Sequence, residues 1–298
     1  MIRRIMVPLD GSAFGEYALR RAAVLARRHR ATLDLAHVHE VASLVLMEGV
    51  PLIDAGVELE GLQSDRTYLD DALKRVAALG LDATATLLDG PTVAALEARA
   101  EELDVDLIVM ATHGRGPLSR AWLGSVADGL ARHTSRPLLL VRPPESADAL
   151  DAERPALDSG APTLRRVLLP VDDVAHARLL LDSASDVAEP GAVFVLLHVA
   201  RGASADDANR ERLIAAVRPP LEQVAADARA RGCDVQLVVD GARDVAGCIL
   251  EIASRTNADL IALTTHGRGT LSRLVFGSVT DKVLRGASLP VLMRKPER

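Results

Sequence analysis

The sequence predicts an α/β protein in which two copies of one open, parallel β-sheet domain follow each other along the chain. Short apolar runs rich in leucine and β-branched residues alternate with segments whose apolar residues recur at helical spacing, and this plan occurs twice. Strands buried on both faces have such continuous apolar sequences, so helices are expected on both faces of each sheet, joined by right-handed crossovers. With 298 residues, 49% of them hydrophobic, the chain is long enough for two buried cores.

The duplication is visible in short landmarks that recur in the same order. Pro8-Leu9-Asp10 matches Pro170-Val171-Asp172, His37-Val38 matches His198-Val199, Asp89-Gly90 matches Asp240-Gly241, Gly114 matches Gly267, and Pro137 matches Pro290. Residues 145–163 carry prolines, acidic and small residues without apolar periodicity, which is typical of an exposed linker. The predicted domains are therefore residues 1–144 and 164–298.

Each element of the first copy has its own sequence signal. The expected strands are at residues 5–7, 32–38, 83–88, 107–110 and 138–141. The first helix is expected to run to about residue 29, because Ala18, Leu19, Ala22, Ala23, Leu25 and Ala26 form one apolar stripe. Further helices are expected at about 62–79, 92–103 and 125–133. In the second copy, strands are expected at residues 167–169, 193–199, 235–239, 260–263 and 291–293.

The copies differ most after the second strand. The first has a long apolar insertion at residues 41–60, whereas the second has a polar segment at 201–212 followed by Pro219-Pro220. Two adjacent prolines predict a break in a helix. Because loops vary where function or partners vary, copy-specific behaviour is expected in this region.

Composition excludes several classes of protein. A net charge of -6 and an aromatic content of 2% provide neither the basic field nor the stacking rings of a nucleic-acid surface. Cys233 and Cys248 are too few and too isolated for a disulfide framework. No apolar run approaches the roughly 18 residues of a membrane span, and a cytoplasmic location is expected.

The most informative stretch is residues 111–126, which returns almost unchanged at 264–279. It contains no P-loop, and Ser119 stands where a dinucleotide fingerprint needs its third glycine. Nine residues separate Gly114 from Gly124, and the second glycine precedes a serine that can cap a helix. Glycine lets the backbone approach an anion that the amides of a helix N-terminus bind, so a phosphate cradle without a lysine is predicted. The alternative is that Gly-Ser only starts a helix.

Asp10 and Asp172 follow the first strand of each copy. If the first and fourth strands are neighbours, these carboxylates and the glycine loop face the same crevice. A carboxylate there can accept hydrogen bonds from a ribose hydroxyl or a base amine. The alternative interpretation is that each aspartate caps the helix that follows.

Other side chains near these motifs have two interpretations each. Arg115, Arg120, Arg268 and Arg273 recur in register, and either contact phosphates or are solvated loop charges. His113 and His266 suggest a catalytic role, but a histidine in such a loop more often forms a hydrogen bond with the backbone. His37 and His39 alternate on one strand, yet no third ligand repeats with them, so a metal site built by the protein is rejected. A divalent ion carried by a nucleotide remains compatible with the sequence.

Taken together, these motifs resemble the universal stress protein family. The resemblance rests on Val-Pro-x-Asp-Gly-Ser near the start, His-Val after the second strand, Thr-His-Gly-Arg-Gly followed nine residues later by Gly-Ser, and Pro-Leu-Leu-Leu-Val-Arg, and it covers nearly all of both copies. It implies two five-stranded parallel sheets of strand order 3-2-1-4-5 that bind ATP, ADP or AMP, with Mg or Mn carried by the nucleotide. The site residues implied in the first copy are Pro8, Asp10, Gly11, Val38, Ala111, Gly114, Arg115, Gly124, Ser125 and Val126. Those in the second copy are Pro170, Asp172, Val199, Thr264, Gly267, Arg268, Gly277, Ser278, Val279 and Thr280.

Two departures from the family pattern affect the expected site. Ala111 and Thr264 stand where the pattern has its first glycine, so a methyl group or a β-branched side chain faces the close backbone approach. The second copy also has Asp173-Val174 in place of Gly11-Ser12, which adds a negative charge near a pocket for an anion. The first copy is therefore expected to bind nucleotide more tightly than the second.

Three functions remain open at the level of sequence. The first is a regulatory protein of the stress response, in which nucleotide occupancy changes conformation or the contacts with an unidentified partner. The second is an enzyme, at most a slow ATPase, since the motif lacks a lysine, an acid and base pair and an activated nucleophile. The third is an interaction module with degenerate sites, because the apolar strands at 138–141 and 291–293 end sheet edges that invite pairing. The family resemblance implies that such strands join the copies into an internal pseudo-dimer, and a further homodimer is compatible with it.

Overall fold

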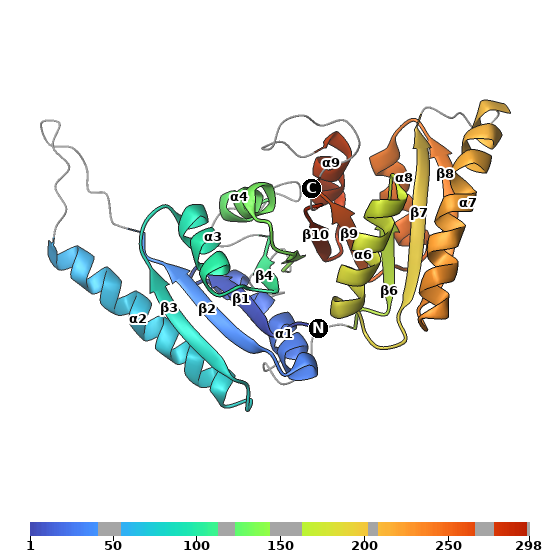
Figure 1. Ribbon diagram of the computed structural model, residues 1–298. Helices are drawn as coiled ribbons and strands as arrows, with labels where there is room; N and C mark the ends of the chain where they lie inside the picture. The colour runs from blue at the N-terminus through green and yellow to red at the C-terminus, as the bar shows by residue number, and fades with distance from the viewer. Residues whose placement is uncertain (41–54, 113–122, 144–162, 202–207, 266–276, 297–298) are drawn as a thin grey trace, which may run out of the picture. The chain divides into compact units, whose positions relative to one another are not determined.

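The computed structural model of the chain describes residues 1–40, 55–112, 123–143, 163–201, 208–265 and 277–296. These residues form two compact units. The first contains residues 1–40, 55–112 and 124–130, and the second contains 131–142 and the described residues from 163 onwards. Figure 1 labels the helices and strands of both units.

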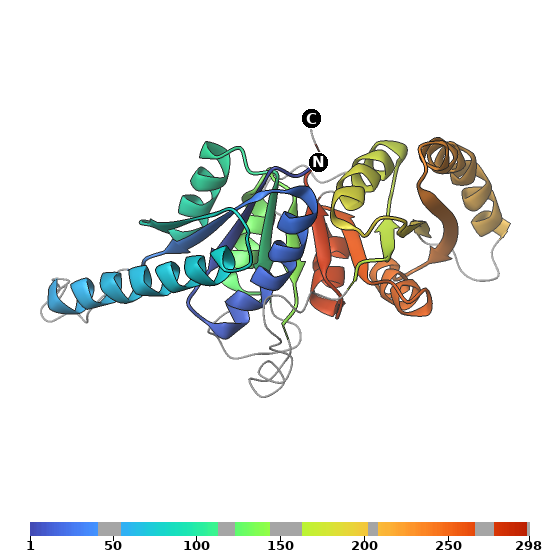
Figure 2. The same cartoon turned by 90° about the horizontal axis from the view of Figure 1, so that it is seen from below.

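The first unit is an α/β domain whose strands and helices alternate along the chain. Its elements are β1 (Arg4–Leu9), α1 (Ala13–His29), β2 (Thr32–Val38), α2 (Ala55–Ala77), β3 (Ala83–Leu88), α3 (Thr92–Glu102), β4 (Leu107–Ala111) and most of α4 (Ser125–His133). The strands lie in the order β3-β2-β1-β4, and all their pairings are parallel. Helices α2 and α3 cover opposite faces of this sheet (Figure 2).

Two side chains of β2, one on each face of the first sheet, show how both faces are covered. Asp34 is fully buried and pairs with Arg99 of α3, with Arg99 Nη2 2.9 Å from Asp34 Oδ1. His37, three residues later, lies 3.3 Å from Asp65 of α2. Side chains at odd and even positions of a strand point to opposite faces, so each helix packs on its own set.

The second unit repeats this plan. Its elements are β6 (Arg166–Pro170), α6 (Val174–Val187), β7 (Val193–Arg201), α7 (Ala208–Ala230), β8 (Asp234–Ala242), α8 (Val245–Arg255), β9 (Leu260–Thr264), α9 (Ser278–Gly286) and β10 (Val291–Arg294). The parallel order β8-β7-β6-β9-β10 is the predicted order 3-2-1-4-5. Strand β5 (Leu138–Val141) also belongs to this unit, where it pairs antiparallel with β10.

The predicted fold class is confirmed, and most strands match within two residues at either end. The strands predicted at 32–38, 83–88 and 138–141 have the observed bounds. Helix α1 begins at Ala13, earlier than its apolar stripe, because Ser12 caps it. The insertion predicted at 41–60 lies outside the described residues as far as residue 54, after which α2 begins.

The predicted break at Pro219-Pro220 is wrong. Both prolines lie inside α7, which continues to Ala230. A proline in a helix interior costs about 3 kcal/mol because it removes a hydrogen bond and crowds the preceding turn. The turns that follow bury Leu221, Val224, Ala225 and Ala228 almost completely, and burial of that apolar face outweighs the local preference.

No helix among the described residues is both long enough and apolar enough to cross a membrane. The described cores consist of aliphatic side chains from both faces of each sheet. Ile5, Leu33 and Ile108 are fully buried in the first unit, and Leu168, Val195 and Ile261 are fully buried in the second.

Candidate functional site

The carboxyl end of β1 holds the first half of the candidate site. Asp10 follows the strand, and its Oδ1 accepts hydrogen bonds from Ser12 N at 3.0 Å and Ser12 Oγ at 2.7 Å. Ser12 is the N-cap of α1, and its Oγ accepts from Gly15 N at 3.0 Å. The alternative interpretation of Asp10 as the helix cap is therefore wrong, because Ser12 fills that position and Asp10 is held by it.

Gly15 leaves room for this arrangement. A Cβ at that position would overlap Asp10 Oδ1 and lie 3.2 Å from Asp10 Cγ. Gly11, one residue after Asp10, has φ of 77°, a left-handed conformation that favours glycine. Gly15 could have been suspected from sequence, because a glycine in the first turn of a helix is unfavourable by about 1 kcal/mol without a packing reason.

The second half of the site is the end of β4 and the start of α4. Ala111 is the last residue of β4 and is buried. Gly124 returns to this point, and its N donates to Thr112 O at 2.8 Å while its carbonyl accepts from Asp128 N at 2.8 Å. Gly124 therefore precedes the helix as its cap, and Ser125 and Val126 form its first turn. The amides of a first turn have no partner within their own helix and can bind an anion.

The two halves lie at the same edge of the first sheet. Strand β1 pairs parallel with β4, with Ile5 opposite Leu107. The strand ends that carry Asp10 and Ala111 are therefore neighbours. Val38 ends β2 on the other side of β1, and Pro8 lies within β1 opposite Ala36. The structure thus brings Pro8, Asp10, Gly11, Val38, Ala111, Gly124, Ser125 and Val126 to one edge.

The second unit has the same layout at the ends of β6 and β9. Val167 pairs with Leu260, so Asp172 and Thr264 follow neighbouring strands. Thr280 Oγ1 donates to Thr264 O at 3.2 Å, which ties α9 to the end of β9. Of the other predicted residues, Pro170 ends β6, Val199 lies in β7, and Ser278 and Val279 lie in the first turn of α9.

The expectation that serine caps α9 is wrong. The N-cap is Gly277, which makes no side-chain cap hydrogen bond, and Ser278 is the first helical residue. Asp281 N donates to Gly277 O at 3.0 Å, as expected for a helix that begins after the glycine. A serine one residue inside the helix exposes its hydroxyl at the start of the first turn, where it can contact an anion.

Several predicted residues lie outside the described part of the chain. These are Gly114, Arg115, Gly267 and Arg268, together with His113, Arg120, His266 and Arg273. Their roles stay predictions.

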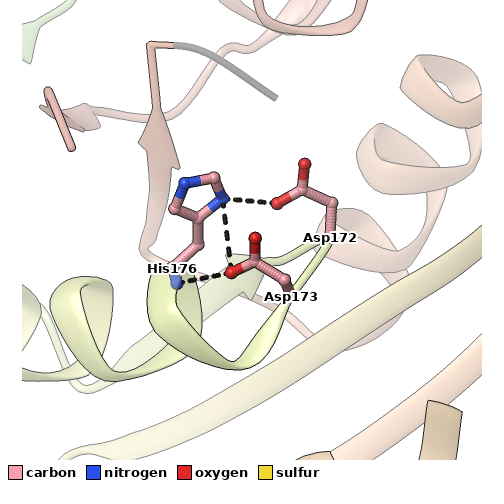
Figure 3. Close-up of side chains that lie close together, drawn as sticks. All are labelled: Asp172, Asp173 and His176. Carbon is pink, nitrogen blue, oxygen red and sulfur yellow. Dashed lines mark hydrogen bonds and ion pairs between the residues drawn. The ribbon is translucent and has the colours of Figure 1, made fainter. Parts of the chain in front are cut away.

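The first-strand aspartate of the second unit has different neighbours from Asp10. Asp172 Oδ1 lies 2.5 Å from His176 Nδ1, and Asp173 is the N-cap of α6, accepting from His176 N at 2.8 Å (Figure 3). Asp173, expected to add negative charge near the pocket, thus caps a helix beside an imidazole. His176 was not among the residues predicted from sequence. The replacement of Phe14 in the first repeat by a histidine at this position could have indicated it.

Known proteins similar to this chain all point to one family. The sequence profile of the universal stress protein family matches residues 1–142 and 163–295. The chain belongs to the universal stress protein family. It is 28% identical to a universal stress protein of Mycolicibacterium smegmatis over 98% of this chain and 97% of that protein. It is 31% identical to the universal stress protein YxiE of Bacillus subtilis, over 48% of this chain and all of that protein.

The fold of a solved universal stress protein agrees with this assignment. A crystal structure of a universal stress protein from Archaeoglobus fulgidus superposes with a TM-score of 0.69, covering 98% of this chain and 96% of that one at 18% identity. At 18% identity, this similarity shows that the two proteins share a fold. The two matched segments identify this chain as a tandem universal stress protein.

A histidine supports the first strand in both repeats of this universal stress protein. His37 Nδ1 lies 2.7 Å from Leu9 O, and His198 Nδ1 lies 2.9 Å from Val171 O. A carbonyl oxygen only accepts, so each Nδ1 carries the proton and donates. Each of these carbonyls immediately precedes the aspartate of its repeat, Asp10 or Asp172. The His-Val landmark therefore fixes the backbone of the site.

His39 lies between two carboxylates that sequence reasoning did not connect with it. Its Nδ1 is 2.7 Å from Asp65 Oδ2 and its Nε2 is 2.9 Å from Glu58 Oε1, both on α2. The hydrogen bond with Asp65 raises the pKa of His39 above its ordinary value, and Glu58 adds to this, while burial of the ring opposes it. Carboxylates only accept, so both ring nitrogens donate when His39 is an imidazolium.

Proposed function

We propose that this universal stress protein binds an adenine nucleotide, ATP, ADP or AMP, at the carboxyl edge of β1 and β4 in its first repeat. The observation that carries the proposal is that Asp10 and the start of α4 follow neighbouring strands at the same edge of the sheet. A carboxylate already oriented by Ser12 stands at the same sheet edge as the first-turn amides that follow Gly124. The carboxylate accepts from hydroxyl or amino groups, and the helix start binds phosphate.

Glycines at two positions support this assignment. Gly124 places no side chain between the helix start and an incoming phosphate. Gly15 keeps the space around Asp10 open, since any Cβ there would overlap the carboxylate. Ala111 is buried at the end of β4, so its methyl group replaces a glycine of the family pattern without lying on the exposed edge. A divalent ion such as Mg or Mn arrives with the nucleotide in this proposal.

The second repeat is proposed to bind nucleotide more weakly. Asp172 is engaged by His176 Nδ1. Gly15 corresponds to Ala177 on the alignment that matches Asp10 with Asp172, and Ala177 is fully buried. A carboxylate in the pose of Asp10 would meet the Cβ of that alanine. The aspartate of the second repeat is therefore turned away from the arrangement that serves a nucleotide in the first.

Nucleotide occupancy is proposed to act as a regulatory signal rather than to support turnover. Residues 1–144 and 164–298 are proposed as the two domains, joined through their last strands as an internal pseudo-dimer. The antiparallel pairing of β5 with β10 in the second unit supports the role of these strands. Helix α4 (Ser125–His133) directly precedes β5 (Leu138–Val141) along the chain, so α4 is proposed as the element that connects the site with β5. The alternatives are slow ATP hydrolysis and an interaction module with degenerate sites.

Isothermal titration of ATP and AMP into the full chain tests this proposal. Asp10→Ala is expected to weaken binding at the tighter site by about 10- to 100-fold, since hydrogen bonds to a charged group contribute about 1.5–3 kcal/mol. The matched change Asp172→Ala is expected to leave that site unchanged. Absence of nucleotide binding by the unaltered chain, or equal losses in both variants, would overturn the assignment. Multiple-turnover hydrolysis that is lost when Gly124 or Ser125 is replaced would favour the enzyme.

A further inference from the structure

Three ligand-bearing atoms converge at the start of α6 in the second unit (Figure 3). Asp172, Asp173 and His176 each offer one such atom, and all three atoms lie within 4.8 Å of one another. His176 Nδ1 is 2.5 Å from Asp172 Oδ1 and 3.7 Å from Asp173 Oδ1. We propose that this Asp-Asp-His cluster binds a divalent transition-metal cation in the second repeat. The proposal is independent of nucleotide binding in the first.

Helix capping explains only one member of the cluster. Asp173 Oδ1 accepts from His176 N, which is the hydrogen bond of a helix N-cap. Asp172 and His176 add a second carboxylate and an imidazole to the same point.

A divalent metal ion can bind all three members of the cluster, whereas one proton bridges only two of them. One proton on Nδ1 serves a single carboxylate, Asp172, because the 3.7 Å to Asp173 is too long for a hydrogen bond. Two carboxylates carry two negative charges, which a divalent cation neutralises. Metal bonds of about 2.0–2.2 Å place the ligand atoms of one ion roughly 3.0–3.5 Å apart. The two observed separations bracket that range, so small rotations of side chains reach it.

The residue types select the class of ion. Two carboxylate oxygens with one imidazole nitrogen suit Mn, Fe, Co, Ni or Zn, whereas Ca and Mg prefer oxygen ligands alone. The side chains of Asp172, Asp173 and His176 are 36%, 20% and 14% exposed, so an ion can enter from solvent. Water would complete the coordination, since three protein ligands leave positions open.

The first repeat lacks this ligand set. The positions that correspond to Asp172, Asp173 and His176 are Asp10, Gly11 and Phe14. Only one of the three can bind a metal ion, so the cluster is specific to the second repeat. This difference gives a matched substitution, because His176→Phe installs the residue that already occupies the same place in the first repeat.

Titration of Co²⁺ into the full chain, stripped with EDTA and free of nucleotide, tests the proposal. One equivalent is expected to bind with visible d–d absorption, and calorimetry with Zn²⁺ gives a second measure of stoichiometry. His176→Phe and Asp172→Asn are each expected to weaken binding by at least tenfold. Asp173→Asn separates ligation from capping, since asparagine still caps a helix but carries no charge. His133→Gln, at an exposed histidine of α4, is expected to change nothing.

Two results would overturn the proposal. One is the absence of a saturable Co²⁺ site in the unaltered chain at concentrations up to about 1 mM. The other is Co²⁺ binding by His176→Phe or Asp172→Asn that is as tight as in the unaltered chain while their thermal unfolding is normal. If His176→Phe does not fold, Asp172→Asn decides the question alone, because it preserves the shape of the side chain.

Discussion

Replacement of Gly15 by alanine tests whether the orientation of Asp10 determines nucleotide affinity. The change adds one methyl group in the buried first turn of α1. That methyl group would overlap Asp10 Oδ1 and lie 3.2 Å from Asp10 Cγ. The carboxylate must therefore turn away, and it then loses the hydrogen bonds from Ser12 N and Ser12 Oγ at 3.0 and 2.7 Å.

The expected loss falls on affinity more than on stability. Asp10 is only half-buried, so its turned carboxylate regains water and each lost Ser12 contact costs about 0.5–1.5 kcal/mol. Alanine is favoured over glycine in a helix by about 1 kcal/mol, which offsets part of that loss. The net change in the free energy of unfolding is expected to stay within about 2 kcal/mol. A misdirected hydrogen bond from the ligand to a charged carboxylate costs about 1.5–3 kcal/mol, or about 10- to 100-fold in the dissociation constant for ATP.

Calorimetric titration of ATP into the full-length Gly15→Ala variant, with urea unfolding in parallel, measures both quantities. Ala177→Gly in the second repeat is the matched control, and it is expected to leave the tighter ATP site unchanged. If Gly15→Ala binds ATP as tightly as the unaltered chain while Asp10→Ala does not, the space beside Asp10 has no bearing on affinity and the reasoning fails.

Two further predictions concern the stability of the first unit. The ion pair of buried Asp34 with half-buried Arg99 corresponds to Val195 and Ile252 when the strands and helices of the repeats are aligned on their first residues. Arg99→Ile alone is expected to lower the free energy of unfolding by about 3–5 kcal/mol, because it leaves the buried charge of Asp34 without its ion-pair partner. Adding Asp34→Val is expected to recover most of this loss. Urea unfolding that shows no recovery in the double variant would contradict this. His39, whose pKa the α2 carboxylates raise from 6.5, stabilises the fold fully below that value, and its contribution is lost as pH rises through the higher folded pKa. Urea unfolding between pH 5.5 and 9 should therefore show a steeper fall for the unaltered chain than for His39→Gln, and equal slopes would count against the His39 contribution.

The fold could be predicted from sequence because its signals are local and repeated. A run such as residues 138–141, Leu-Leu-Leu-Val, is apolar along its whole length, as is typical of a strand buried on both faces. The failure at Pro219-Pro220 has the opposite origin. The prolines are local signals too. The helix is nevertheless retained, because Leu221 and Val224 are buried against the sheet, and a rule based on neighbouring residues in the sequence does not take such tertiary contacts into account.

The site was predictable only where its residues lie in a motif. Asp10 and Gly124 belong to strings that occur twice, and the parallel pairing of their strands places them together. The contacts of His39 with Glu58 and Asp65 were not predictable, because they depend on how α2 is positioned along β2. No pattern within either segment specifies that position.

The two repeats show how one fold accommodates different chemistry at the same strand end. Strand order and core come from many aliphatic contacts spread over each sheet, and residues beyond the strand ends contribute little to them. A change there alters the partner of a carboxylate without disturbing the core. With Ser12 and Gly15, Asp10 is held open beside a helix start that suits phosphate. In the second repeat, where His176 and Ala177 replace Phe14 and Gly15, Asp172 faces His176 and forms part of a ligand set that suits a cation. On the two proposals made above, a nucleotide prefers the first repeat and a transition-metal ion prefers the second, so the binding of one need not exclude the other.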